Sequence, residues 1–165
     1  MAGRRDAALL EASVKTRLLD TRRHLAALEA AVAAFGDGFD AVSFERAWRS
    51  DQPEELHRSY LVQAGCENVI NAVVQAGREL CELKGWLAGG AASSSVDVLR
   101  VLHENGVVDA QVRRELRQVQ ELRSRVQHDY ANVEGRRVYE AVLLVLDAAP
   151  RMIQDAVLTL RGGSA

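Results

Sequence analysis

Mostly apolar residues recur at alternating spacings of four and three along the first part of the chain. The positions are Val14, Leu18, Thr21, Leu25, Leu28, Val32 and Phe35. This is the period of one face of an α-helix, so we expect a long first helix that packs lengthwise against a partner. The turn residues of "FGDGFD" end the pattern, and a short helix is expected around "SFERAW".

A second helical pattern runs from about residue 53 to about residue 87. Its inward positions are predicted to be Leu56, Tyr60, Ala64, Val69, Ile70, Val73, Gly77, Leu80, Leu83 and Leu87. Asp51 and Glu54 have the spacing of a capping box, and Pro53 stands in the first turn, where a missing N–H costs nothing. The segment "AGGAASSS" then ends the helix, and we expect a flexible loop at about 88–94.

Three more helices are expected in the second half of the chain. The segment "VDVLRVLHEN" predicts a short helix, capped by Ser94 or Ser95 and closed by a glycine. Asp109 can cap the next helix. The apolar stripe of that helix consists of Val112, Leu116, Val119 and Val126. The last pattern, roughly 134–160, is apolar on most sides, so it predicts the central helix, with a kink at Pro150.

Together these patterns predict an all-α fold, an antiparallel bundle of about five helices. Residues 1–165 are expected to form a single domain, because a chain of this length can bury one core but falls short of what two cores need. Flexible termini are expected at about 1–6 and 161–165. The two prolines and the 5% content of aromatic residues agree with helices rather than strands.

Charge, cysteines and hydropathy exclude several classes of protein. A formal net charge of −2 argues against coating of nucleic acid by bulk electrostatics, although it leaves room for a local basic face. No segment has the apolar length of an export signal or of a membrane span, so we expect a cytoplasmic protein without membrane contact. Cys66 and Cys81 have no metal-binding spacing and are expected to be reduced core residues.

One arginine interrupts the apolar stripe that follows Asp109. Arg123 comes four residues after Val119 and three before Val126, so its side chain leaves the helix toward the core or toward a partner surface. In most proteins such an arginine extends its charged end to water or pairs with a carboxylate. Its position therefore calls for an explanation, and the residues that follow offer one.

His128 comes five residues after Arg123, close to the expected end of the same helix. On a continuous helix this spacing separates two side chains by about 140° around the axis and about 7.5 Å along it. The two can meet only if the helix ends or loosens near His128. Asp129, Tyr130 and Asn132 are suitable terminators there.

Arg123, His128 and Tyr130 together form the pattern R-x4-H-x-Y, which is followed by "NVEGRRVYEAV". This pattern resembles the motif of the HEPN ribonuclease toxins. The residues after it resemble the start of the helix that succeeds the motif in HepT-like members. Two positions depart from the family: Ser124 stands where Asn or Asp is usual, and Gln127 stands where an apolar residue is usual.

The resemblance implies a toxin that cleaves RNA without a metal or other cofactor, in a homodimer whose two motifs face one shared cleft. Arg123 and His128 would be catalytic, with Ser124 and Asp129 supporting the cleft. Tyr130 would be the residue to which a cognate nucleotidyltransferase antitoxin attaches AMP. The residue chemistry agrees, since RNA supplies its own nucleophile in the 2′-OH. A histidine can then move protons near neutral pH, while an arginine stabilises the charge on the phosphorane.

Arginines are dense around this motif. Between residues 113 and 137 the chain has seven arginines (113, 114, 117, 123, 125, 136 and 137) and four acidic residues (115, 121, 129 and 134), a local excess of three positive charges. This excess predicts a surface for the RNA backbone, with Arg113, Arg114 and Arg125 as candidates. Ion pairs along a solvated helix, such as Arg117 with Glu121, would account for the arginines equally well.

Two other classes of function remain open from the sequence. A HEPN bundle can bind a nucleotide or a partner protein without cleaving, and a plain helical interaction protein would make the motif accidental. The intact spacing of Arg123, His128 and Tyr130 favours the enzyme, because a module released from catalysis does not need it. An interaction protein also leaves Arg123 on the apolar stripe unexplained.

Overall fold

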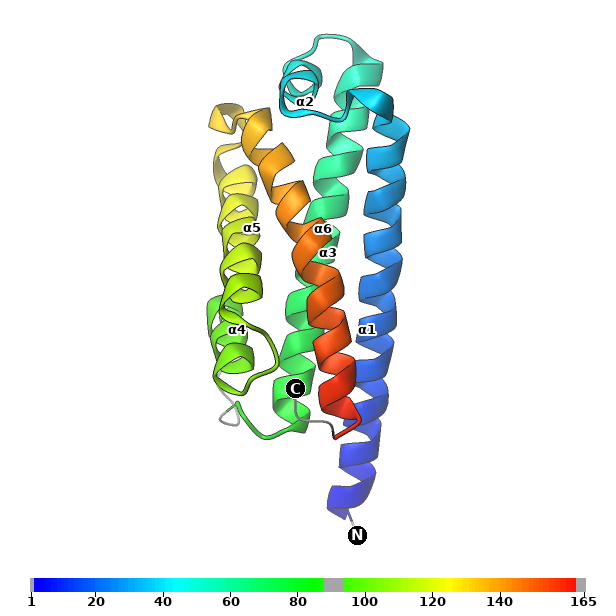
Figure 1. The fold of residues 1–165 in the computed structure, drawn as a ribbon, viewed down its shortest axis with the longest axis vertical. Helices are drawn as coiled ribbons and strands as arrows, with labels where there is room; N and C mark the ends of the chain where they lie inside the picture. Colours follow the sequence, from blue (N-terminus) through cyan, green and yellow to red (C-terminus); the bar gives the residue numbers. More distant parts are fainter. Residues whose placement is uncertain (1, 88–93, 163–165) are drawn as a thin grey trace.

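The computed structural model describes residues 2–87 and 94–162, and within them it contains helices and no strand. The elements are α1 (Ala2–Phe35), the 3-10 helix η1 (Gly36–Gly38), α2 (Ala41–Trp48), α3 (Pro53–Leu83), α4 (Ser95–Glu104), α5 (Ala110–Asp129), the 3-10 helix η2 (Tyr130–Asn132) and α6 (Gly135–Leu160). The long helices α1, α3, α5 and α6 alternate in direction (Figure 1). The predicted all-α antiparallel bundle is therefore confirmed.

Some predicted segments fall beyond these residues. The loop expected at about 88–94 lies outside them except for Ser94, as do residues 1 and 163–165 of the expected flexible termini. Across the described helices, none combines the length and the hydropathy that crossing a membrane requires.

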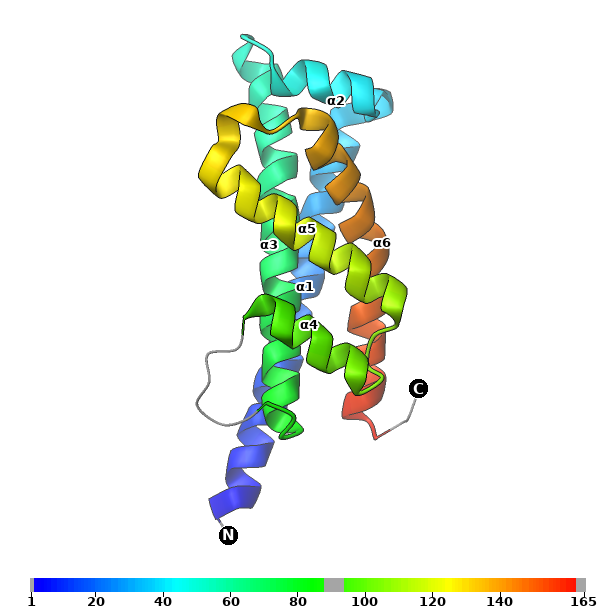
Figure 2. The same ribbon diagram turned by 90° about the vertical axis from the view of Figure 1, so that its left-hand side faces the viewer.

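The bundle is organised around α3. Helices α1, α3 and α6 run side by side, α4 and α5 cover one side, and α2 crosses one end (Figures 1 and 2). Because α3 packs against each of the other five α-helices, it is the central helix, and the prediction that the last helix takes this place is wrong. The reason is that α6 borders solvent along one side, where Leu143 and Leu158 are exposed. The helix continues through Pro150, which is also exposed.

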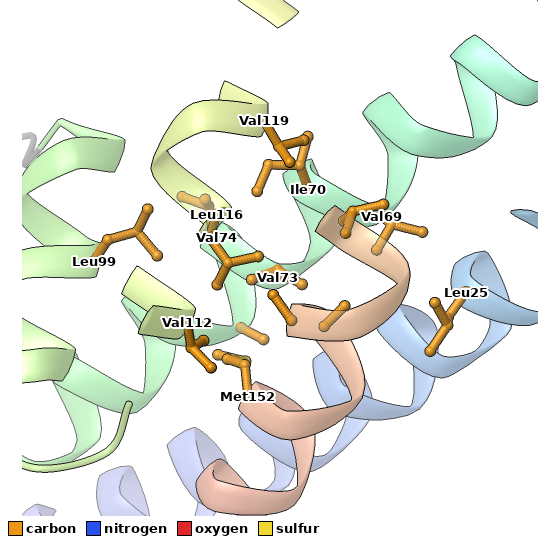
Figure 3. Close-up of a cluster of buried hydrophobic side chains, with 14 of the residues drawn as sticks. Leu25, Val69, Ile70, Val73, Val74, Leu99, Val112, Leu116, Val119 and Met152 are labelled. Carbon is orange, nitrogen blue, oxygen red and sulfur yellow. The ribbon is translucent and has the colours of Figure 1, made fainter. Parts of the chain in front are cut away.

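The core is built by α3 meeting its neighbours (Figure 3). Side chains of α3 pack with those of α1, α4, α5 and α6, and the labelled ones are Leu25, Val69, Ile70, Val73, Val74, Leu99, Val112, Leu116, Val119 and Met152. All four residues of the predicted α5 stripe are buried. Cys66 and Cys81 are free and buried, and burial raises the pKa of their thiols to about 12 and about 11. They are the core residues that the sequence predicts.

The first half of α3 turns a different side inward from the one predicted. Tyr60 and Ala64 are exposed, while Ser59, Val62 and Cys66 are buried. The buried row keeps steps of three and four residues. The predicted row needed a five-residue step from Ala64 to Val69, which a regular helix places on another side.

The ends of the helices follow local hydrogen bonding. α3 begins after Gln52 without a side-chain cap, so the capping box predicted for Asp51 and Glu54 is wrong. The helix ends at Leu83, earlier than predicted, because Gly85 adopts φ +68° and the next N–H bonds back to the helix. Ser94 caps α4 by accepting a hydrogen bond from the backbone N–H of Asp97 at 3.2 Å, one of the two caps proposed from the sequence.

Candidate functional site

The motif lies at the end of α5, which is capped at its start as predicted. The side chain of Asp109 accepts a hydrogen bond from the backbone N–H of Val112 at 2.8 Å. α5 remains helical through His128 and ends at Asp129, so the expectation that the helix ends near His128 is confirmed. The chain then turns through η2, where the Asn132 side-chain amide donates to Asp129 Oδ1 at 2.7 Å.

Arg123 starts on the inner side of α5, as its place in the apolar stripe predicts. The residue is half-buried, and its Nε is buried with no hydrogen-bond partner among the described residues. It lines a cavity of about 20 Å³ together with Gln63 and Glu67 of α3, whose side chains are bonded to each other at 2.6 Å. The sequence did not indicate these two polar neighbours of Arg123, because both belong to a helix that is far from the motif along the chain.

His128 lies on a different side of the same helix. It is exposed, and so are Ser124 and Arg125, which precede it by one helical turn and therefore share its face. Because α5 is continuous here, Arg123 and His128 leave the axis about 140° apart. The chain thus groups Ser124, Arg125 and His128 on one face of α5 and directs Arg123 elsewhere.

The arginines around the motif lie in several places. Arg125 of α5 and Arg137 of α6 border a groove of about 450 Å³ between the two helices. Arg113 and Arg114 lie near the start of α5, about 20 Å along the axis from His128. Arg117 pairs with Glu121 at 2.9 Å, so the ion pair considered in the sequence analysis is present. Of the three arginines proposed to contact the RNA backbone, only Arg125 is close to His128.

Tyr130 belongs to a large aromatic cluster at the same end of the bundle. The chain has eight aromatic residues, and seven of them make connected ring contacts: Phe35, Phe39, Phe44, Trp48, Tyr60, Tyr130 and Tyr139. The Tyr130 ring lies 4.9 Å from Trp48 and 5.8 Å from Tyr60, measured between centroids. Burial, and then the neighbouring phenol of Tyr60, raise the pKa of Tyr130, so its hydroxyl is protonated at neutral pH.

Helix α2 lies beside the turn after the motif (Figure 2), and its side chains contact that turn. Trp48 Nε1 donates to the carbonyl of Val133 at 2.9 Å, and Glu45 Oε2 accepts from the backbone N–H of Arg136 at 2.8 Å. Gly135 lies so close to the indole that a Cβ at this position would stand 2.6 Å from Trp48 Cβ. Sequence reasoning missed these contacts because the partners are more than 80 positions apart, and only the helical pattern of "SFERAW" indicated that α2 exists.

Within residues 2–87 and 94–162, His, Cys, Asp and Glu side chains form no group of three or more that could hold an ion.

An all-helical bundle that carries R-x4-H-x-Y at the end of its fifth helix has the features of a HEPN domain. A family model described as "Ribonuclease HepT-like" matches residues 40–155, which is more than half of the chain and includes the motif. The chain belongs to the HepT-like ribonuclease family. A search of the curated proteins found no match to this chain, and neither did a search of the solved structures.

Proposed function

We propose that this protein is a metal-independent endoribonuclease that works as a homodimer and acts as the toxin of a toxin–antitoxin pair. The observation that supports it most is the intact R-x4-H-x-Y motif at the end of α5, with His128 exposed, in a chain of the HepT-like ribonuclease family. RNA is the substrate class that this chemistry needs, because the attacking group is its own 2′-OH.

The proposed reaction is a transfer within the RNA. The 2′ oxygen attacks the adjacent phosphorus, the bond from phosphorus to the 5′ oxygen breaks, and a 2′,3′-cyclic phosphate and a 5′-OH result. His128 takes the proton from the 2′-OH, and a protonated imidazole supplies one to the leaving 5′ oxygen. Arg123 stabilises the phosphorane, since a guanidinium keeps its charge and can bind two phosphate oxygens at once.

A homodimer solves a geometric problem of this site. One protomer directs Arg123 and His128 to different sides of α5 and offers one proton-transfer group. A two-fold axis beside the motif would bring two histidines and two arginines from identical surfaces into one cleft. The second imidazole can then hold the proton that the leaving group needs, while Ser124 and Asp129 border the cleft.

Cleavage is expected to persist in excess EDTA, because neither proton transfer nor charge stabilisation is assigned to a metal. The measurement is gel analysis of RNA incubated with purified protein, with mass spectrometry to identify the 2′,3′-cyclic ends. RNA with 2′-deoxy sugars is the matched control and should stay intact. Loss of cleavage on chelation would contradict the mechanism, and RNA binding without any cleavage would favour the non-catalytic module.

Tyr130 is the residue at which we propose that the antitoxin inactivates the ribonuclease. A nucleotidyltransferase antitoxin would direct its phenolic oxygen to the α-phosphorus of ATP, with pyrophosphate leaving and AMP remaining on the tyrosine. The hydroxyl is protonated at neutral pH, so the antitoxin must supply the base that removes the proton. The attached nucleotide adds negative charge and bulk near His128, which opposes binding of an RNA phosphate.

Co-incubation with ATP and a nucleotidyltransferase encoded beside this protein should raise the intact mass by one AMP group and stop cleavage. Tyr130→Phe should gain no mass and should keep its activity in the presence of the antitoxin. Tyr139→Phe is the matched control, since Tyr139 is half-buried in the same aromatic cluster. Inhibition of the wild type without a change in mass would mean that the antitoxin acts by binding alone.

A further inference from the structure

Two partly exposed tyrosines lie together at the end of the bundle that carries the motif. Tyr60 of α3 is 39% exposed and Tyr130 is 37% exposed. Their ring centroids are 5.8 Å apart, and the rings meet edge to face at 66°. The other five members of the aromatic cluster are buried or half-buried. Tyr60 and Tyr130 therefore form its surface.

The two tyrosines of this aromatic surface pack on a buried tryptophan. The buried ring of Trp48 contacts both tyrosines, at 6.1 Å from Tyr60 and 4.9 Å from Tyr130 between centroids. Trp48 is itself fixed by its hydrogen bond to Val133 and by the close approach of Gly135. Rings that are already ordered lose little freedom when a ligand stacks on them, so the arrangement suits binding.

The surface adjoins the groups assigned to phosphate chemistry. Tyr130 follows the exposed His128 by two residues, and Arg125 shares the face of α5 with that histidine. In a single strand of RNA, each phosphate is flanked by bases whose flat faces are free to stack on aromatic side chains. An aromatic surface close to His128 in the chain therefore offers such a base a place to stack.

We propose that Tyr60 is the stacking platform of a nucleobase subsite beside the motif, which binds an unstacked base of single-stranded RNA. The inference rests on the proposed ribonuclease function and deepens it by naming the feature of the substrate that is bound. The same ring would also face the adenine of an AMP group carried by Tyr130. A nucleobase is the ligand in both cases, and the experiment separates the two sources.

The test measures binding of 2′-O-methyl pentaadenylate, which cannot be cleaved because its 2′ oxygens carry no proton. An abasic oligonucleotide of the same length keeps the phosphates and removes the bases, and free AMP is the third probe. Tyr60→Ala should weaken pentaadenylate binding about tenfold, the range of one base stacked on one ring. Tyr60→Phe should bind like the wild type. Leu61→Ala, a neighbour on α3 that is 49% exposed, is the matched control and should change nothing.

The abasic oligonucleotide should bind weakly to the wild type, and its affinity for Tyr60→Ala should be the same. A loss with pentaadenylate assigns the subsite to RNA, whereas a loss with AMP alone assigns it to the adenylyl group. Equal binding of all probes by the wild type and Tyr60→Ala would overturn the inference, and so would an equal loss with the abasic probe. Failure of the wild type to cleave RNA would instead refute the proposed function and leave a binding result for Tyr60 intact.

Discussion

Replacing His128 with alanine is expected to lower the rate of RNA cleavage by about 10²–10⁴-fold, the usual contribution of a general acid–base group. Replacing Arg123 with alanine should cost about 10²–10³-fold, as removal of one charge-stabilising donor does. His128 is exposed, so its loss should leave the melting temperature unchanged. Arg123 buries its Nε without a partner, so its removal should not destabilise the core by breaking a hydrogen bond.

The effect on rate is measured by single-turnover cleavage of a defined RNA. Circular dichroism measures the melting temperature, and light scattering measures the oligomeric state. His24→Ala is the matched control, because His24 is exposed on α1 outside the part of the chain that matches the family. Both variants and the wild type should scatter light as dimers at micromolar concentration. Full activity in either variant would end the ribonuclease proposal, and a monomer that still cuts RNA would refute the shared cleft.

Gly135→Ala is expected to destabilise the fold by about 1–3 kcal/mol, the usual cost of forcing an atom into a packed site. Its new Cβ would stand 2.6 Å from Trp48 Cβ and 3.0 Å from Glu45 Oε2. The strain falls on the contacts through which α2 holds the turn that carries Tyr130. Cleavage should therefore decline together with stability, although Gly135 touches no reacting group.

Urea unfolding of the two proteins measures the effect. Gly38→Ala is the control, since a Cβ there meets no atom closer than 3.8 Å and the backbone does not have positive φ. A Gly135→Ala protein as stable as the wild type would mean that α2 shifts freely and does not fix the turn.

The helices and their buried sides were largely predictable because they depend on local periodicity. The α5 stripe is the clearest case, and the position of Arg123 within it directed attention to the motif. The prediction for α3 went wrong at Tyr60, where an aromatic ring at nearly helical spacing was assigned to the core. The buried row through Ser59, Val62 and Cys66 keeps regular helical steps, so spacing alone, applied strictly, places Tyr60 on the outer side.

The surroundings of the motif were beyond sequence reasoning. The residues that hold Tyr130 and the turn after it come from α2 and α3, and the bonds from Trp48 and Glu45 span 85 and 91 positions. No period or short motif records such pairs. The end of α5 was predictable, because polar terminators follow His128 and the helix ends at Asp129. The regular course of the helix through His128, which keeps Arg123 on another side, was not.

The position of Trp48 allows its intrinsic fluorescence to report on the surroundings of Tyr60 and Tyr130. The chain has two tryptophans, and Trp86 lies just beyond the far end of α3. A Trp86→Phe protein would keep a single indole, 4.9 Å from the Tyr130 ring and in contact with Tyr60. Its emission would respond to whatever approaches the two tyrosines. Substrate docking, nucleotide transfer and movement of α2 could then be followed in real time by fluorescence, with no dye attached to the RNA or to the protein.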